Sequence, residues 1–141
     1  MSRRPFLGVL SIAVLLVGCG SDVPSEASAH LSVKGVDRLV FELTEFTVPA
    51  GQQVDLELTA GEAVEHVFVI EAAASVGSVE DGDHSDQDLP PDDLAVVHAQ
   101  PGETATGTFM IRQPGTYQVY CSVPGHREAG MVATLTVIED S

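Results

Sequence analysis

Alternating hydrophobic and polar residues fill most of the chain from residue 30 onward. Residues 30–61 contain two such stretches on either side of the turn Pro49-Ala50-Gly51, and in the second stretch Val54, Leu56 and Leu58 alternate with polar residues. A period of two is the pattern of half-buried β-strands. We therefore expect extended structure on both sides of this turn, with valine and leucine facing a core.

Five more strands are predicted further along the chain. Residues 64–72 form a near-continuous apolar run, which predicts a buried strand. Residues 93–123 predict three strands separated by the turns Pro101-Gly102 and Pro114-Gly115, and residues 131–140 predict a last one. Six to eight short strands without a long amphipathic helix predict an all-β fold, a β-sandwich. A chain of 141 residues fits one such domain.

One acidic segment interrupts the strand pattern. Residues 75–93 hold seven carboxylates, one histidine and two prolines and show no apolar periodicity. We expect a solvated loop between strands, in which His84 is a surface residue rather than a metal ligand. A calcium site is the alternative, although the spacing does not match the EF-hand pattern.

The first 18 residues predict an export signal. A short basic region containing Arg3 and Arg4 precedes the apolar stretch Phe6–Gly18, which is shorter than the roughly 20 residues that a membrane-spanning helix needs. The residues around the two arginines are similar to a twin-arginine signal, and an ordinary basic region is the alternative.

The end of this signal is similar to a bacterial lipobox. Leu16-Val17-Gly18-Cys19 predicts that Cys19 carries lipid and becomes the first residue of the mature chain, with a coincidental cleavage site as the alternative. Residues 19–30 are then a flexible tether, and residues 31–141 are one domain. We expect an exported protein that is lipid-anchored on the outer face of the bacterial cell membrane, in the periplasm or its extracytoplasmic equivalent.

The net charge of the chain limits the classes of partner that it can bind. The sequence has 6 Lys and Arg against 21 Asp and Glu, a net charge of −15, and removal of Arg3 and Arg4 with the signal makes it −17. Such a surface excludes nucleic acid as a natural partner and favours basic docking surfaces on protein partners. A generic acidic surface that aids solubility is the alternative.

The candidate chemistry lies in the segment YCSVPGHREAGM, residues 120–131. Cys121, His126 and Met131 lie at equal intervals in a stretch too rich in Pro and Gly to be a helix. A thiolate, an imidazole and a thioether suit copper, and two histidines, one cysteine and a weak axial methionine form a blue-copper site. If Cys19 carries lipid, Cys121 has no intramolecular disulfide partner, and a bound metal explains how a lone thiol escapes oxidation.

A blue-copper site needs a second histidine from elsewhere. His66 is our choice because it lies near the start of the buried strand predicted for residues 64–72, where the core can fix it. His30 lies at the edge of the tether and His84 in the acidic loop, and His98 is followed at once by a turn toward the surface.

These four residues in this order resemble the cupredoxin family. The resemblance covers residues 35–138 and includes FTVPAGQQVDLEL before His66 and GTFMIRQPGTYQVYCSVPGH before the ligand loop, which is most similar to those of rusticyanin and auracyanin. It implies a Greek-key β-sandwich of about eight strands. It also implies one copper ion, cycling between Cu(I) and Cu(II), at one pole of the sandwich, with His66, Cys121, His126 and Met131 as ligands.

The resemblance also implies how electrons enter. The exposed edge of His126 would be the entry point, within an apolar patch that includes Pro124, Gly125 and Ala129. One position departs from the family: Val67 stands where an asparagine often hydrogen-bonds between the two ligand-bearing segments. That bridge is therefore expected to be lost or replaced.

The resulting expectation is a monomeric single-electron carrier rather than an enzyme. It would pass electrons between a membrane complex and a terminal oxidase or reductase, and a copper chaperone or storage protein that delivers copper to an oxidase is the alternative. A binuclear centre would need a second cysteine, and positions 122–130 contain none. A metal-free sandwich that simply buries these side chains also remains open, as does a Cys121/His126 nucleophilic pair, which lacks an orienting third group.

Overall fold

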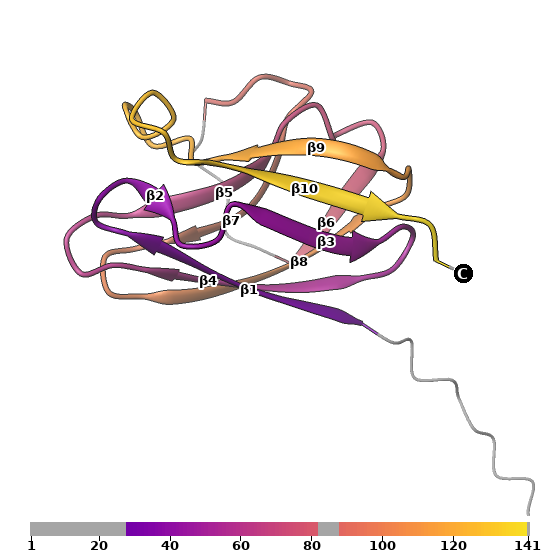
Figure 1. Cartoon of the computed structure of the whole chain (residues 1–141), viewed down its shortest axis with the longest axis horizontal. Coiled ribbons are helices and arrows are strands. Elements are labelled where there is room, and N and C mark those ends of the chain that lie inside the picture. Colours follow the sequence, from indigo (N-terminus) through magenta and orange to yellow (C-terminus); the bar gives the residue numbers. More distant parts are fainter. Residues whose placement is uncertain (1–27, 82–87, 141) are drawn as a thin grey trace, which may run out of the picture.

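Two five-stranded β-sheets pack face to face in the computed structural model, which describes residues 28–81 and 88–140 (Figure 1). One sheet has the order β2-β1-β4-β8-β6 and the other the order β3-β10-β9-β5-β7. The strands are β1 (Ala29–Val36), β2 (Val40–Phe41), β3 (Glu45–Pro49), β4 (Val54–Ala60), β5 (His66–Ile70), β6 (Gly77–Asp81), β7 (Leu94–Ala99), β8 (Thr104–Ile111), β9 (Gly115–Tyr120) and β10 (Val132–Ile138). The predicted all-β sandwich is confirmed.

The core lies between the two sheets and follows the predicted alternation. Val54, Leu56 and Leu58 of β4 are buried, whereas Asp55 between them is exposed. The ring of Phe68 in β5 lies at the centre, and its centroid is 6.1, 6.1 and 6.4 Å from those of three other phenylalanines, Phe41, Phe46 and Phe109. Four aromatic side chains drawn from both sheets therefore fix how the sheets pack.

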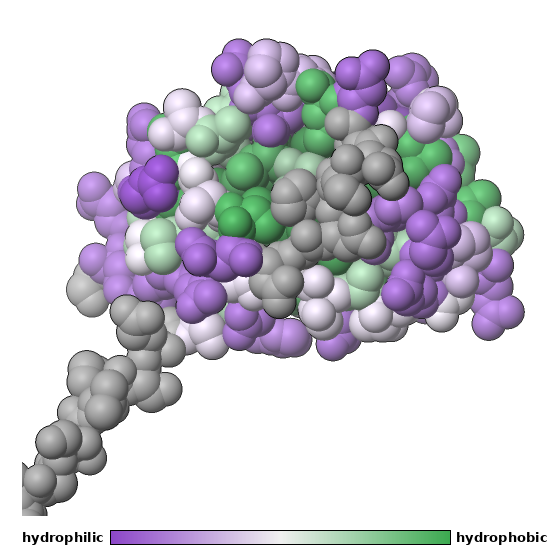
Figure 2. Space-filling view, turned by 180° about the vertical axis from the view of Figure 1, so that it is seen from behind, coloured by the Kyte–Doolittle hydropathy of each residue, from purple (hydrophilic) through white to green (hydrophobic). Residues whose placement is uncertain are grey.

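Strand β5 is buried on both faces, as its apolar run predicts. Phe68 and Ile70 face the main core, whereas Val67 and Val69 join Ala95 and Tyr120 in a second apolar cluster on the outer side of their sheet. Leu89, in the connection that leads to β7, packs against this second cluster. On the face of the molecule shown in Figure 2, hydrophobic side chains form patches between hydrophilic ones.

Residues 30–61 form more strands than the two stretches predicted from their sequence. Strand β1 turns back on the two-residue β2 through a tight turn, in which Leu39 has φ = 59° and its N–H donates to the Val36 carbonyl at 3.0 Å. The chain then crosses to the other sheet, where β3 pairs in parallel with β10. Residues 37–44 contain neither Gly nor Pro, so the sequence gives no turn signal here.

The prediction of one uninterrupted acidic loop at residues 75–93 is wrong in part. Residues 77–81 form β6, which pairs antiparallel with β8 at the edge of its sheet. An edge strand is held by backbone hydrogen bonds to a single neighbour and needs few apolar side chains, and Val79 is the only apolar residue here that is not glycine. His84 and the rest of residues 82–87 lie outside the described residues.

Strand β1 begins inside the segment predicted to be a tether. Ala29 pairs in parallel with Val54 of β4, and the exposed His30 is already part of this ladder. The predicted signal, Cys19 and most of the tether lie outside the described residues. Among those that are described, no helix is long and apolar enough to cross a membrane.

Candidate metal centre

The candidate site lies at one end of the sandwich, where two neighbouring strands of one sheet bring distant residues together. Strand β5 begins at His66, and the antiparallel strand β9 ends at Tyr120, immediately before Cys121. Residues 121–131, the ligand loop, connect β9 to β10 and carry the other three predicted ligands. Because β5 and β9 run in opposite directions, the beginning of one lies next to the end of the other.

Three of the four predicted ligands converge in a buried cluster. The Sγ atom of Cys121 and one ring nitrogen each of His66 and His126 all lie within 4.8 Å of one another. Sγ of Cys121 is 3.5 Å from Nδ1 of His126, and the two imidazole rings lie 5.4 Å apart at 62°. His66 and Cys121 are fully buried, and His126 is 6% exposed.

The His66 ring provides the test of whether a metal fits. Both its nitrogens, Nδ1 and Nε2, are buried and make no hydrogen bond of good geometry within the described residues, although the Val36 backbone lies close enough to raise the pKa of the ring. Leaving buried polar atoms unpaired is unfavourable, and native structures seldom do so. A metal ion that accepts a nitrogen lone pair would satisfy one of these atoms, so the residues present fit a metal.

Burial also sets the protonation of the ligands. It lowers the pKa of His66, which the nearby His126 lowers further, and it lowers the pKa of His126. Both imidazoles therefore stay neutral at neutral pH and keep a lone pair available. Burial raises the pKa of the Cys121 thiol, against the opposing effect of the Val67 and Val123 backbone amides, so metal binding must displace a thiol proton.

Met131 completes the predicted set from the far end of the ligand loop. Its side chain is fully buried, and its methyl group lies beside the His66 ring, because both contact the same backbone position, Gly35 of β1. A Cβ atom at Gly35 would lie 2.4 Å from Cδ2 of His66 and 2.9 Å from Cε of Met131. Only a glycine fits there without displacing one of these two side chains.

Sequence reasoning missed Gly35. The available signal was an isolated glycine within an alternating strand pattern, which often marks a close approach of another group to the backbone.

Backbone hydrogen bonds close the ligand loop. Cys121 N–H donates to the Met131 carbonyl at 3.1 Å, and Met131 N–H donates to the His126 carbonyl at 3.0 Å. Gly125 and Gly130 have φ of 86° and 108°, in the left-handed region that favours glycine. The two bonds tie the three ligand-bearing positions to one another.

The bridge that was expected to be lost or replaced at Val67 is supplied by the main chain. Val67 N–H donates to Cys121 Sγ at 3.3 Å, so the residue after His66 links the two ligand-bearing segments without a polar side chain. The Val67 side chain instead packs in the outer cluster with Leu89.

The other two described histidines, His98 and His30, lie outside the cluster. His98 lies opposite Val67 on β7 and pairs through Nε2 with Glu65 Oε2 at 2.6 Å. His30 is exposed on β1. The choice of His66 over these two agrees with the geometry.

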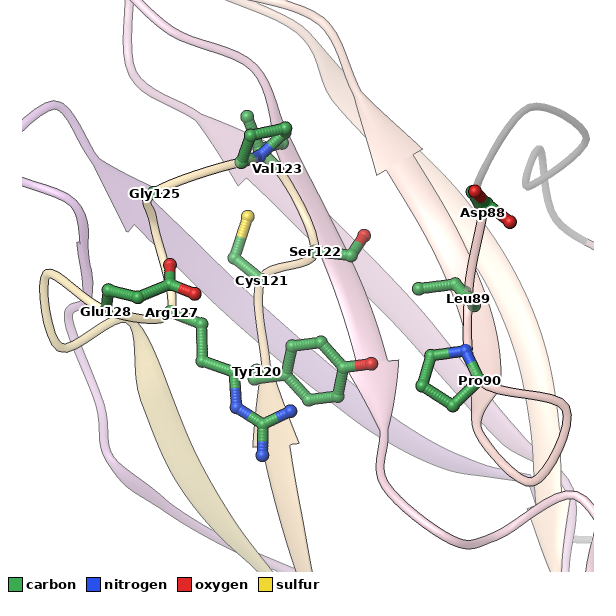
Figure 3. Close-up of a pocket in the computed structure, with 11 residues that line it drawn as sticks. Asp88, Leu89, Pro90, Tyr120, Cys121, Ser122, Val123, Gly125, Arg127 and Glu128 are labelled. Atoms are coloured by element: carbon green, nitrogen blue, oxygen red, sulfur yellow. The ribbon is translucent and has the colours of Figure 1, made fainter.

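Two shallow surface pockets flank the cluster. One has a volume of about 290 Å³ and is lined by Ala63, Val64, Glu65, Gln100, Pro101, Val123 and His126. The other, of about 200 Å³, lies beside Tyr120, Cys121 and Arg127 (Figure 3). Pro124, Gly125 and Ala129, which were expected near the His126 edge, are all exposed.

Comparison with known proteins shows which family this chain matches. Residues 27–138 match the copper binding proteins of the plastocyanin/azurin family. Auracyanin-B of Chloroflexus aurantiacus is 33% identical over 134 residues, which cover 84% of this chain and 56% of that protein, so the chain spans little more than half of that relative. The copper-resistant cuproprotein CopI of Rubrivivax gelatinosus is 28% identical, covering 79% of this chain and 68% of CopI.

Solved structures agree with the sequence comparison. Auracyanin A, a "blue" copper protein from the green thermophilic photosynthetic bacterium Chloroflexus aurantiacus, superposes with a TM-score of 0.64 at 25% identity, covering 79% of this chain and all of that one. The fold, the buried His-Cys-His cluster and these likenesses lead to one conclusion. The chain belongs to the plastocyanin/azurin family of copper-binding proteins, the cupredoxins, and binds one copper ion.

Proposed function

We propose that the protein is a mononuclear type 1 copper protein that carries single electrons outside the cytoplasm. His66, Cys121 and His126 would hold the copper ion, with Met131 as the weak fourth ligand. The observation that carries this proposal is the buried cluster of three donor atoms, one from His66 at the start of β5 and two from Cys121 and His126 of the ligand loop.

The bound ion would supply a one-electron couple, Cu(I)/Cu(II). The residues of this chain hold the donors in place and exclude water. His66, Cys121 and Met131 are fully buried, and β5 and the closed ligand loop fix them from two sides. A site that admits no extra water ligand and does not rearrange is suited to rapid electron transfer.

The surface around His126 would be the place of electron entry. His126 is the only one of the four proposed ligands with exposed surface, 6%, and it lines a pocket together with Ala63, Val64 and Pro101. The pocket is also lined by Val123 and by the polar residues Glu65 and Gln100, and apolar side chains next to polar ones suit a transient interface between electron-transfer proteins.

The location and the partners are part of the proposal. Cys19 would carry lipid and tether the domain to the outer face of the cell membrane, which the signal-like residues 1–18 support. The net charge of −15 over the whole chain supports redox partners with basic docking surfaces, such as a membrane electron-transfer complex and a terminal oxidase or reductase.

The test is to produce residues 20–141, add Cu(II), and record the visible absorption and electron paramagnetic resonance spectra. An intense thiolate-to-copper charge-transfer band that is lost in Cys121→Ser supports the proposal. His30→Gln is the matched control, because His30 is exposed and lies outside the cluster. Absence of the band from the wild-type protein would reject the assignment.

Copper delivery or storage is the second candidate, and the similarity to CopI, whose name describes a copper-resistant cuproprotein, favours it. The two functions make opposite demands on copper release. A carrier retains copper in the presence of a chelator and gives a reversible voltammetric couple. A delivery protein loses copper rapidly to a chelator or to a copper-free oxidase.

A further inference from the structure

The side chain of Arg127, the residue after His126, leaves the ligand loop and lies against the sheet. Its Nη2 atom donates hydrogen bonds to Glu71 Oε1 at 2.7 Å and to Gln118 Oε1 at 2.9 Å. Its guanidinium carbon is 4.1 Å from the centre of the Tyr120 ring. In Figure 3 the Arg127 side chain extends alongside this ring, whereas the Cys121 sulfur points away from it.

These contacts join the ligand loop to both strands that present the other two proposed ligands in the cluster. Glu71 directly follows β5, which begins at His66, and Gln118 and Tyr120 belong to β9, which leads into Cys121. Glu71 N–H donates to the Gln118 carbonyl at 2.9 Å, so the two partners of Arg127 are also tied to each other.

The aromatic surface under Arg127 is itself anchored. The Tyr120 hydroxyl donates to Asp93 Oδ2 at 2.5 Å, and Asp93 Oδ1 accepts from Ala72 N–H at 2.9 Å. Tyr120 is buried in the outer cluster with Val67 and Val69. Arg127 therefore rests on a ring whose hydroxyl end is held by a hydrogen bond to Asp93.

These contacts fix the orientation of the Arg127 side chain more than they stabilise the fold. The side chains of Arg127 and Glu71 are 37% and 39% exposed, and ion pairs of that exposure add little to the stability of a fold. A planar guanidinium bound to two acceptors and stacked on an aromatic face, however, has one preferred orientation. Since a single peptide bond joins Arg127 to His126, holding Arg127 restricts the backbone of His126.

We propose that Arg127 is a positioning residue of the copper centre. It clamps the His126 part of the ligand loop to the strands of His66 and Cys121 and so holds the His126 ring in one orientation relative to the thiolate. The assignment rests on the proposed function of the site and adds the element that keeps the ring still when the charge at the site changes.

The test compares three variants with a matched control. Arg127→Gln removes the clamp. Glu71→Gln keeps an acceptor oxygen but removes the negative charge of the ion pair, and Arg127→Lys keeps the positive charge without the planar guanidinium. Arg112→Gln removes the same charge from an exposed residue that follows β8. A role confined to stability would lower the midpoint of unfolding and speed exchange throughout the core rather than selectively in the ligand loop, without moving the thiolate-to-copper band.

The first readout is amide hydrogen exchange in the copper-free protein. Arg127→Gln is expected to speed exchange at the amides of His126, Ala129 and Met131 by about tenfold relative to Arg112→Gln, because the loop opens locally more often. Arg127→Lys should recover part of the protection, and Glu71→Gln should show an intermediate effect.

The second readout is made on the copper-loaded protein. Arg127→Gln is expected to shift the thiolate-to-copper band and slow electron self-exchange several-fold, with Arg112→Gln unchanged. The proposal would be overturned if the exchange rates of the loop amides, the position of the band and the self-exchange rate all equalled those of Arg112→Gln. If Arg127→Gln does not fold, the same comparison is made with Glu71→Gln. A wild-type protein without the band would reject the copper function, while the exchange data would still test the clamp.

Discussion

The main-chain N–H of Val67 donates a hydrogen bond to Sγ of Cys121 at 3.3 Å, which links two proposed ligand-bearing segments 54 positions apart. The bond comes from the backbone and does not depend on the residue type at position 67. This position therefore keeps the bridge between the segments while its side chain packs in the outer apolar cluster.

Val67→Ala is predicted to separate these two roles. Loss of a buried side chain should lower the free energy of unfolding by about 1–3 kcal/mol, because a cavity remains in the outer cluster. The charge-transfer band of the copper-loaded protein should keep its position, because the amide is unchanged. Urea unfolding and visible absorption measure the two effects, and a clear displacement of the band would contradict a role confined to the main chain.

Gly35→Ala is predicted to damage the site directly. The added methyl group would lie 2.4 Å from Cδ2 of His66, so the ring or the Met131 methyl group must move. We expect weaker copper retention and a loss of roughly 1–3 kcal/mol in the free energy of unfolding.

Gly51→Ala is the control for Gly35→Ala. Gly51 has φ = 71° with nothing within 4 Å of the added Cβ, so the substitution strains the backbone without touching the site. Copper retention should be normal in this variant. Equal copper retention in Gly35→Ala and Gly51→Ala would show that Gly35 has no special relation to the ligands.

The stability of the copper-free protein is predicted to fall as the pH drops below about 6.5. Burial lowers the pKa of His66 and His126 below their ordinary value of 6.5 in the folded protein, whereas the unfolded chain keeps that value. The unfolded state therefore binds more protons once the pH passes below 6.5, and the folded state loses stability until its own lowered pKa values are reached.

Urea unfolding between pH 8 and pH 5 measures this dependence, and His66→Gln isolates the contribution of one ring. The loss of stability on acidification should be smaller in His66→Gln than in the wild type. Identical pH profiles would mean that His66 titrates normally in the folded state and would contradict the lowering of its pKa by burial.

Tyr120→Phe is predicted to destabilise the protein while keeping the aromatic ring on which Arg127 rests. It removes the hydroxyl that donates to Asp93, a hydrogen bond to a charged acceptor worth about 1.5–3 kcal/mol. Burial and Asp93 also raise the pKa of Tyr120, so the hydroxyl stays protonated and able to donate.

Tyr117→Phe is the matched control, since the Tyr117 hydroxyl donates to the backbone carbonyl of Gln113, an uncharged acceptor in an exposed turn. Unfolding experiments should give a larger loss for Tyr120→Phe than for Tyr117→Phe. A loss no larger than that of the control would show that the bond to Asp93 is weak in solution.

Sequence reasoning could predict the features that depend directly on residue type and spacing. The alternation of Val54, Leu56 and Leu58 predicted their shared face, and the apolar run around Phe68 predicted a buried strand. The donor types and equal intervals of Cys121, His126 and Met131 predicted a metal-binding loop, and the place of His66 at the start of a buried strand distinguished it from His98.

The features that could not be predicted depend on backbone contacts or on long side chains. Strand β6 is an edge strand, and its backbone ladder to β8 leaves no apolar pattern in residues 77–81. The turn at Leu39 lacks the usual turn residues. The hydrogen bond from Val67 is invisible in the sequence because every residue except proline has an amide, and the contacts of Arg127 depend on a register that only the folded sheet defines.

The central claim is that His66, Cys121 and His126 together hold one copper ion. X-ray absorption spectroscopy at the copper edge, on the protein loaded with one equivalent and measured oxidised and reduced, tests it most directly. The account predicts one short copper–sulfur contact and two nitrogen donors of the imidazole type, with little change in these distances on reduction. A shell of only oxygen and nitrogen donors, or loss of the sulfur contact in one oxidation state, would contradict it.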